Sequence, residues 1–387
     1  MPQSTDAAAT GAGSVIPKIA ELDGLRGIAI IMVLMHHVAS EGALWAHPVA
    51  KVLLYPFSTL GWSGVDLFFV LSGFLITSIL LECKQQQSRH YFRNFYARRI
   101  LRIMPIYYLS LVLVFVVERR YFDRWIGTAG AHQPYYWAYL QNWLEVCRVR
   151  TGFSSGWIGH LWSLGLEEQF YLVWPVVVWL LRPRWLLTLG LSLLGCGLVA
   201  RLIFSRIATT GFEAYSFSSF TRYDELVFGA MVAISQNDHR EWMERFARRA
   251  SALLLSGLVV ALALTIACFG VWAPQIGNPL MRIVGYTLLG GIAAGSIIQA
   301  LHGETDGFFR RLLRKRWLCF VGAISYGLYI YHTLVQCVVS DWLHDCPRID
   351  GVVGVAVITL AVTFLVAYFS YNLVEVPVMR LKRHFAK

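Results

Sequence analysis

Charged residues are scarce in this sequence. Of its 387 residues, 15% are Asp, Glu, Lys or Arg, whereas soluble domains contain about 25%. Apolar residues make up 57%, and aromatic residues, which are typical of the belts at membrane surfaces, make up 14%. This composition excludes a soluble globular protein and predicts a chain that crosses a membrane several times.

Paired cysteines and a secretory leader are also lacking. The seven cysteines include no CxxC pair and several fall within apolar segments, so neither a disulfide framework nor a metal site is expected. One bridge between Cys147 and Cys346 stays open. Residues 1–20 lack the basic and apolar regions of a cleaved signal peptide, so we expect a disordered cytoplasmic tail.

Long apolar runs predict an all-α polytopic membrane protein. On a template of about 20 residues per span, we place about ten transmembrane helices. They lie near residues 22–40, 62–81, 102–118, 160–181, 185–204, 222–236, 251–271, 281–300, 317–339 and 352–373. Residues 21–375 then form one membrane domain, and residues 376–387 a basic cytoplasmic tail.

The net charge of +11 is an orientation signal. With the N-terminus inside, inner loops hold about twice as many Lys and Arg residues as outer loops, which favours two cytoplasmic termini. The basic residues are divided among short loops and form no single patch, so nucleic-acid binding is not expected.

The first predicted span contains ionisable residues, which are costly in hydrocarbon and therefore indicate function. Arg26 and His37 are eleven residues apart. That spacing returns to nearly the same helix face about 16 Å further along the axis. His36 points about 80° away from His37. We expect a cation near the surface and an imidazole at depth on one stripe.

Other spans also carry polar stripes, which must face one another or a wet central cavity. Depth estimates place His37, Glu167 and His332 in one layer. Purely structural interpretations of these residues stay open. His332 could form a satisfied helix–helix hydrogen bond, and Asp66 and Glu167 could form structural ion pairs. Arg98, Arg99 and Arg102 could be only a positive-inside anchor. The stripes comprise Asp66 in the second span, His160, Ser163 and Glu167 in the fourth, and Ser325, Tyr329 and His332 in the ninth.

Several motifs resemble the acyltransferase-3 family of membrane O-acyltransferases. DGLRG at 23–27 followed by the His36–His37 pair resembles its opening Arg-x10-His signature. The segment FYARRILRIMPIY at 95–107 resembles its Arg-x-x-Arg segment, here Arg99 and Arg102. Further matches follow in order: GVDLFFVLSGF at 64–74, HLWSLGLEEQFY at 160–171, residues 222–229, and VGAISYGLYIYH at 321–332.

The resemblance implies a ten-span bacterial inner-membrane enzyme that acylates surface carbohydrates. Some family members carry a fused extracytoplasmic esterase-like domain, and since this sequence ends at Lys387 we expect the chain to act without one. We therefore predict transfer of an acyl group, most simply acetyl, from acyl-CoA as co-substrate to a hydroxyl of a carbohydrate or glycolipid, with no permanently bound cofactor.

The predicted site residues fall into three groups. His37, Glu167 and Arg26 are the expected catalytic residues, with His37 as the general base. Arg26, Arg99 and Arg102 are expected to bind the CoA phosphates, because guanidinium groups pair with phosphates bidentately. Residues expected to bind substrate or orient the catalytic groups are His36, Asp66, His160, Ser163, Tyr329 and His332. A polytopic transporter of an anionic solute is the alternative.

Overall fold

The computed structural model describes residues 19–39, 48–117, 125–206, 216–238, 240–246, a few positions between 253 and 263, 281–344 and 352–385. The expected tail 1–20 lies almost wholly outside these residues, as do most of the predicted span 251–271 and Cys346.

Every regular element in the described ranges is a helix. The first part contains α1 (Ala20–Ala39), α2 (Pro48–Leu60), η2 (Gly61–Ser63), α3 (Gly64–Gln85), α4 (Tyr91–Val112) and η3 (Leu113–Val117). Short helices follow: η4 (Gly127–His132), α6 (Gln133–Trp137), α7 (Gln141–Val146), α8 (Arg148–Thr151) and η5 (Gly156–Leu161). The middle part contains α9 (Trp162–Leu180), α10 (Pro183–Arg206), α12 (Ser219–Asp238) and α13 (Arg240–Phe246).

The C-terminal part begins with η7 (Met281–Gly285), α15 (Tyr286–His302), α16 (Phe308–Leu313) and α17 (Arg316–Ala323). It continues with α18 (Ser325–His344), α19 (Val352–Ser370), η8 (Tyr371–Glu375), α20 (Val376–Arg380) and η9 (Leu381–Phe385).

Within the described residues, six helices are long and apolar enough to cross a membrane. They are Ala20–Ala39, Leu54–Gln85, Tyr91–Val116, Pro183–Arg206, Ile283–His302 and Gly354–Phe385. The pair α17 and α18, bent by 69°, is a seventh if it forms one span. The all-α polytopic membrane fold is therefore confirmed, whereas the number ten stays a prediction.

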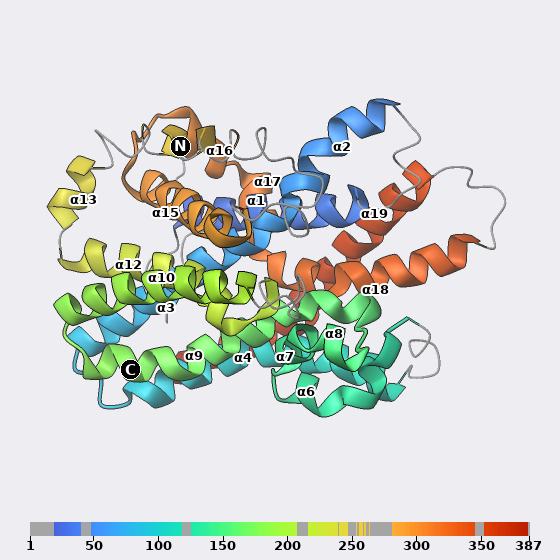
Figure 1. The fold of residues 1–387 in the computed structure, drawn as a ribbon, viewed down its shortest axis with the longest axis horizontal. Coiled ribbons are helices and arrows are strands. Elements are labelled where there is room, and N and C mark those ends of the chain that lie inside the picture. Colours follow the sequence, from blue (N-terminus) through green and yellow to red (C-terminus); the bar gives the residue numbers. More distant parts are fainter. Residues whose placement is uncertain are drawn as a thin grey trace, which may run out of the picture.

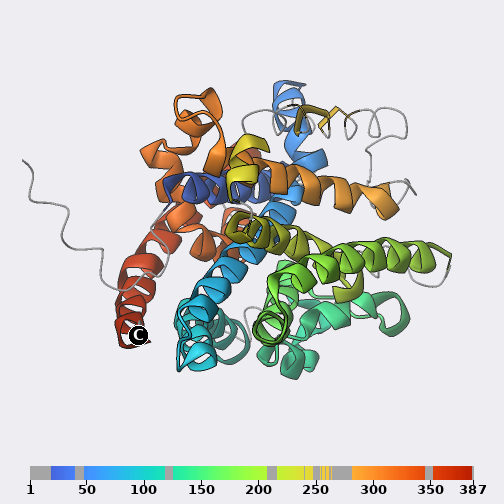
Figure 2. The same ribbon diagram turned by 90° about the vertical axis from the view of Figure 1, so that its left-hand side faces the viewer.

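Helix α1 lies in the middle of the fold. It packs against α17, α2, α3 and α18, and Figure 2 shows it between α3 and the C-terminal helices. Figure 1 shows α18 beside α19 at one end, with the short helices α6–α8 next to them. This placement brings the middle of α1 close to residues from both halves of the sequence.

Glycines let α3 and α12 approach one another closely. A Cβ atom on Gly73 would lie 1.8 Å from the carbonyl oxygen of Leu226, and one on Gly229 would lie 1.9 Å from that of Val70. No other residue fits such a contact, and small residues serve the same purpose at many membrane helix interfaces. The contact fixes the position of α3, which lines the cavity described below.

The last helix extends further than the predicted end near residue 373. Helical structure continues from Gly354 to Phe385. Pro377 occupies the first turn of α20, directly after the π-helical segment η8, where a missing backbone N–H costs little. Residues 376–385 therefore form a helical segment, and η9 packs against α4.

Candidate active site between two cavities

One cavity, which we call the arginine cavity, contains three of the predicted cations. Arg26 of α1 and Arg99 and Arg102 of α4 line it, together with side chains of α3, α9 and α18. It encloses about 740 Å³ of empty space, including its open mouth. Arg26 and Arg99 are far apart in the sequence, and the fold brings both to the same cavity.

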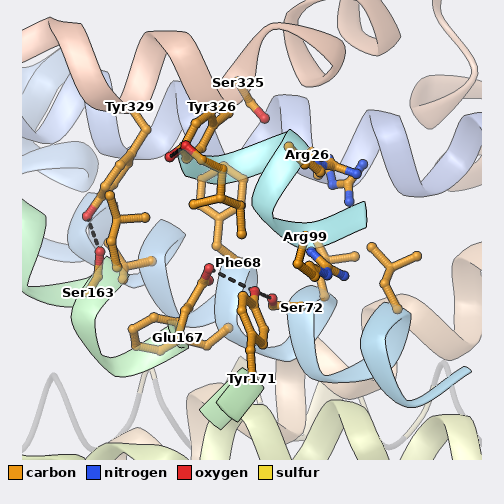
Figure 3. Close-up of a pocket in the computed structure, with 17 residues that line it drawn as sticks. Arg26, Phe68, Ser72, Arg99, Ser163, Glu167, Tyr171, Ser325, Tyr326 and Tyr329 are labelled. Carbon is orange, nitrogen blue, oxygen red and sulfur yellow. Dashed lines mark hydrogen bonds between the residues drawn. The ribbon is translucent and has the colours of Figure 1, made fainter. Parts of the chain in front are cut away.

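Tyr171 lies at the centre of the polar contacts in this cavity. Its hydroxyl donates a hydrogen bond to Glu167 Oε2, 3.0 Å away, and also bonds to the hydroxyl of Ser72. The guanidinium carbon of Arg99 lies 4.9 Å from the Tyr171 ring centroid. Figure 3 shows Arg26 and Arg99 at one side of the cavity and the Glu167–Tyr171–Ser72 chain below them. The arrangement places one carboxylate among several cations.

Tyr329 and Ser163 line the opposite end of the cavity (Figure 3). The Tyr329 hydroxyl donates to the carbonyl oxygen of His160, 2.8 Å away. It lies 2.6 Å from Ser163 Oγ, which therefore donates to it. These bonds tie α18 to the junction of η5 and α9, and Tyr329 leads from the arginine cavity to a group of imidazoles.

Three imidazole rings from three different segments contact one another in series. The ring centroids of His37 and His332 are 4.7 Å apart, and those of His332 and His160 are 4.8 Å apart. His332 is buried. The predicted convergence of His37 and His332 is thus confirmed. Glu167 lines the arginine cavity and accepts a hydrogen bond from Tyr171.

A second cavity, which we call the tryptophan–histidine cavity, is lined by two of these three imidazoles. His37 and His160 line it together with Trp125, Trp157, Ser154 and Thr333. The Thr333 hydroxyl lies 3.0 Å from His160 Nδ1. His37 and His160 thus line this second cavity, and both touch the buried His332.

Three predicted residues, His332, Asp66 and His36, lie outside the lining of both cavities. Asp66 forms a buried ion pair with Arg222, which also bonds to Glu225 at 3.0 Å. These contacts agree with the interpretation of Asp66 as a member of a structural ion pair. A ring nitrogen of His36 lies 3.2 Å from the carbonyl oxygen of Phe57. Its ring meets that of His37 edge-on, with centroids 5.5 Å apart.

Sequence reasoning missed several residues of the site. Ser72 and Thr333 are small hydroxyl residues within apolar helices, and such residues give little signal. Trp125 and Trp157 lie in a segment that we did not assign to any span. Lys382 was placed in a tail, yet it interacts electrostatically with Arg102, Arg99 and Arg98. A polar pattern continuing beyond residue 373 is the signal that could have found it.

Metal binding finds no support in the geometry. In the part of the chain that the structure describes, no group of three or more His, Cys, Asp and Glu side chains is arranged to hold a metal ion. The three imidazoles contact one another edge-on, as packed rings do.

Comparison with known proteins gives one family and several relatives. A family model described as an acyltransferase domain matches residues 19–368. The peptidoglycan O-acetyltransferase OatA of Listeria monocytogenes is 25% identical over 374 residues, which cover 94% of this chain and 56% of that protein. The O-acetyltransferase OatA of Staphylococcus aureus is 27% identical over 373 residues, 93% of this chain and 57% of that protein. The chain thus spans about half the length of these relatives, and no solved structure matches it.

Proposed function

This chain belongs to the acyltransferase-3 family, and from that premise we propose that it transfers an acetyl group from acetyl-CoA to a hydroxyl of a cell-envelope carbohydrate. The observation that carries the proposal is a pair of cavities: Tyr329, which lines the first, contacts the rings of His160 and His332, and His37 and His160 line the second. A cationic cavity suits the donor, and an uncharged, aromatic cavity suits the acceptor.

The arginine cavity is the proposed donor site. Coenzyme A carries a pyrophosphate and a 3′-phosphate, and guanidinium groups bind phosphate oxygens bidentately. Arg26, Arg99 and Arg102 line this cavity. The pantetheine arm would then run past Phe68 towards Tyr329, which places the thioester close to the imidazoles.

His37 is the proposed general base. It accepts the proton of the acceptor hydroxyl while the hydroxyl oxygen attacks the thioester carbonyl carbon. A carbon–oxygen bond forms, the carbon–sulfur bond breaks, and the proton finally protonates the departing thiolate of CoA. Because His37 lines the second cavity and contacts His332, the acceptor and the donor would approach the same imidazole group from opposite sides.

The proposed acceptor class follows from the relatives, and the proposed orientation in the membrane follows from the charge pattern. The L. monocytogenes relative is named for O-acetylation of peptidoglycan, so a glycan of the cell envelope is the proposed acceptor class. We place the chain in the bacterial inner membrane with both termini in the cytoplasm. Since the arginine cavity contains Arg26 near the N-terminal end of α1, it would open toward cytosolic CoA.

Acetyl transfer by the purified protein tests the proposal. The protein in proteoliposomes receives radiolabelled acetyl-CoA and soluble peptidoglycan fragments, and labelled glycan is measured by mass spectrometry and counting. The wild type should form labelled product, and His37→Ala should reduce its rate by about 10²- to 10⁴-fold, the usual contribution of a general base.

His36→Ala is the matched control, because His36 bonds to a backbone carbonyl and lines neither cavity. It should retain most activity. Uptake of a labelled anion into the vesicles with no acetylated product would favour the transporter instead. Wild-type rates in His37→Ala would remove His37 from the general-base role.

A further inference from the structure

Two loops that surround the tryptophan–histidine cavity are tied to one another by their backbones. The Thr128 N–H donates to the carbonyl oxygen of Ser154, 2.9 Å away, and the Ser154 N–H donates to Thr128 Oγ1 at 2.9 Å. The Trp157 N–H donates to the carbonyl oxygen of Trp125 at 3.1 Å. These bonds hold Trp125 and Trp157 in a fixed relationship.

Two glycines make this close pairing of loops feasible. Gly127 and Gly156 have φ values of +57° and +52°, which side chains other than glycine rarely adopt. A Cβ on Gly156 would lie 1.9 Å from the carbonyl oxygen of Trp125. Glycine loses more conformational entropy on folding than other residues do. Its presence at both positions indicates that the fold requires this spacing of the two tryptophans.

The two indole rings form a corner. Their centroids are 6.4 Å apart and their planes meet at 75°. Both rings are only partly buried. His37 and His160 complete the lining with the hydroxyls of Ser154 and Thr333, so apolar ring faces and hydrogen-bonding groups surround one space.

The charges of the side chains that line the cavity limit the chemical class of ligand that it can bind. Apart from the imidazoles, no ionisable side chain appears among its lining residues in the described part of the chain. A phosphate or carboxylate would find no arginine or lysine here, in contrast to the arginine cavity. A pyranose ring fits, because its C–H face is apolar enough to lie on an indole while its rim hydroxyls need donors and acceptors.

We propose that Trp125 and Trp157 form the acceptor subsite, a two-sided platform that holds one neutral pyranose ring and turns one of its hydroxyls toward His37. The inference rests on the proposed function and specifies the substrate class of the same site. It also explains why His37 and His160 line this cavity, while the buried His332 behind them contacts both rings.

Binding of a sugar oligomer, measured apart from catalysis, tests the subsite. The full chain in detergent is titrated with a soluble N-acetylglucosamine tetramer by calorimetry, and in a second arm with a lipid-linked disaccharide in nanodiscs. Trp157→Ala should weaken binding about fivefold, since aromatic stacking is worth about 1 kcal/mol and about 1.4 kcal/mol is tenfold. Trp157→Phe should lose less, and Trp125→Ala should resemble Trp157→Ala.

Two controls separate the platform from general damage. Trp185→Ala removes a half-exposed tryptophan on α10 that lines neither cavity, and it should change nothing. Acetyl-CoA affinity, measured in every variant, should stay within twofold. The arm with the tighter binding identifies whether the sugar arrives free or lipid-linked.

Each outcome decides one question. Sugar binding that is lost in Trp157→Ala supports the subsite, even if the wild type forms no acetylated product and the proposed function fails. Absence of binding by the wild type in both arms overturns the subsite. Unchanged binding in both alanine variants does so too, as does a parallel loss of acetyl-CoA binding, which would reveal a structural role.

Discussion

His332 donates its Nδ1–H to the carbonyl oxygen of Tyr329, 2.8 Å away, while its ring contacts that of His37. A carbonyl oxygen can only accept, so in the neutral ring this bond fixes the tautomer and leaves Nε2 with its lone pair. No hydrogen-bond partner is recorded for this buried Nε2 atom within the described residues. His332 is therefore placed to receive a hydrogen bond or a proton next to His37.

Replacing His332 by asparagine separates this role from a structural one. His332→Asn retains an amide N–H at the position of Nδ1, so the bond to Tyr329 survives while Nε2 is lost. We expect kcat to fall by about 10²-fold, the lower range for a proton-transfer group. Acyl transfer by the purified variant is the measurement. If His332→Asn keeps wild-type turnover, His332 only anchors the helix.

The arginines of α4 should contribute more to donor affinity than to acceptor affinity. Arg99→Ala and Arg102→Ala should each weaken acetyl-CoA binding by about tenfold or more, because hydrogen bonds to charged groups contribute about 1.5–3 kcal/mol. Arg99→Lys should substitute poorly, since an ammonium group cannot bind a phosphate bidentately. Calorimetry in detergent gives the dissociation constants.

Arg93→Ala is the control for these two, because Arg93 is exposed on the same helix. It should leave acetyl-CoA affinity unchanged. Equal affinity in all three variants would mean that the arginines of α4 only anchor the helix at the membrane surface.

Apolar patterning predicted much of the fold, because the length and hydropathy of an apolar run identify a membrane helix. The helices containing Arg26 and Asp66 lie where long apolar runs suggested, whereas the helix containing Arg99 begins at Tyr91, well before the predicted start near residue 102. The last helix extends beyond the predicted end of its span near residue 373, and Pro377 lies in the first turn of α20. A proline in a first turn has no hydrogen bond to break.

Within the site, the spacing along one helix predicted which residues share a face. It did not predict which helices contact one another. Arg26, His37 and Tyr329 do line the cavities, and the buried His332 contacts His37. Which stripe meets which depends on close helix contacts such as that of Gly73, which a sequence pattern does not reveal. Depth estimates therefore joined Glu167 with His37, although Glu167 lines the arginine cavity.

The buried ion pairs should matter for stability. Arg222→Met would leave the carboxylates of Asp66 and Glu225 buried without their cation, which typically costs about 3–5 kcal/mol. The melting temperature in detergent should fall markedly. Arg148→Met, which removes a half-exposed arginine 3.9 Å from the buried Glu145, should cost less than Arg222→Met, because a long and partly solvated pair contributes little. Equal shifts in the two variants would contradict this difference.

The positive-inside pattern predicts a cytoplasmic N-terminus. In a variant whose seven native cysteines are replaced, Thr10→Cys should react with a membrane-permeant maleimide and resist an impermeant one added to intact cells. A cysteine introduced at Arg93 should behave in the same way. Labelling of either position from outside would reverse the orientation and remove the arginine cavity from the cytosolic supply of CoA.

Glu167 and Glu168 are neighbours in sequence, yet only Glu167 should be needed for turnover. Both carboxylates interact electrostatically with Arg99, but Glu167 alone lines the arginine cavity and accepts the Tyr171 hydrogen bond. Glu167→Gln keeps the shape and the bond but removes the negative charge that balances the cations. We expect its turnover to fall by about tenfold or more, as loss of a charged hydrogen bond predicts, while Glu168→Gln stays near the wild type. Acyl transfer by the two purified variants, at matched melting temperature, is the measurement. Equal rates, or a larger defect in Glu168→Gln, would show that cavity lining identifies the wrong carboxylate.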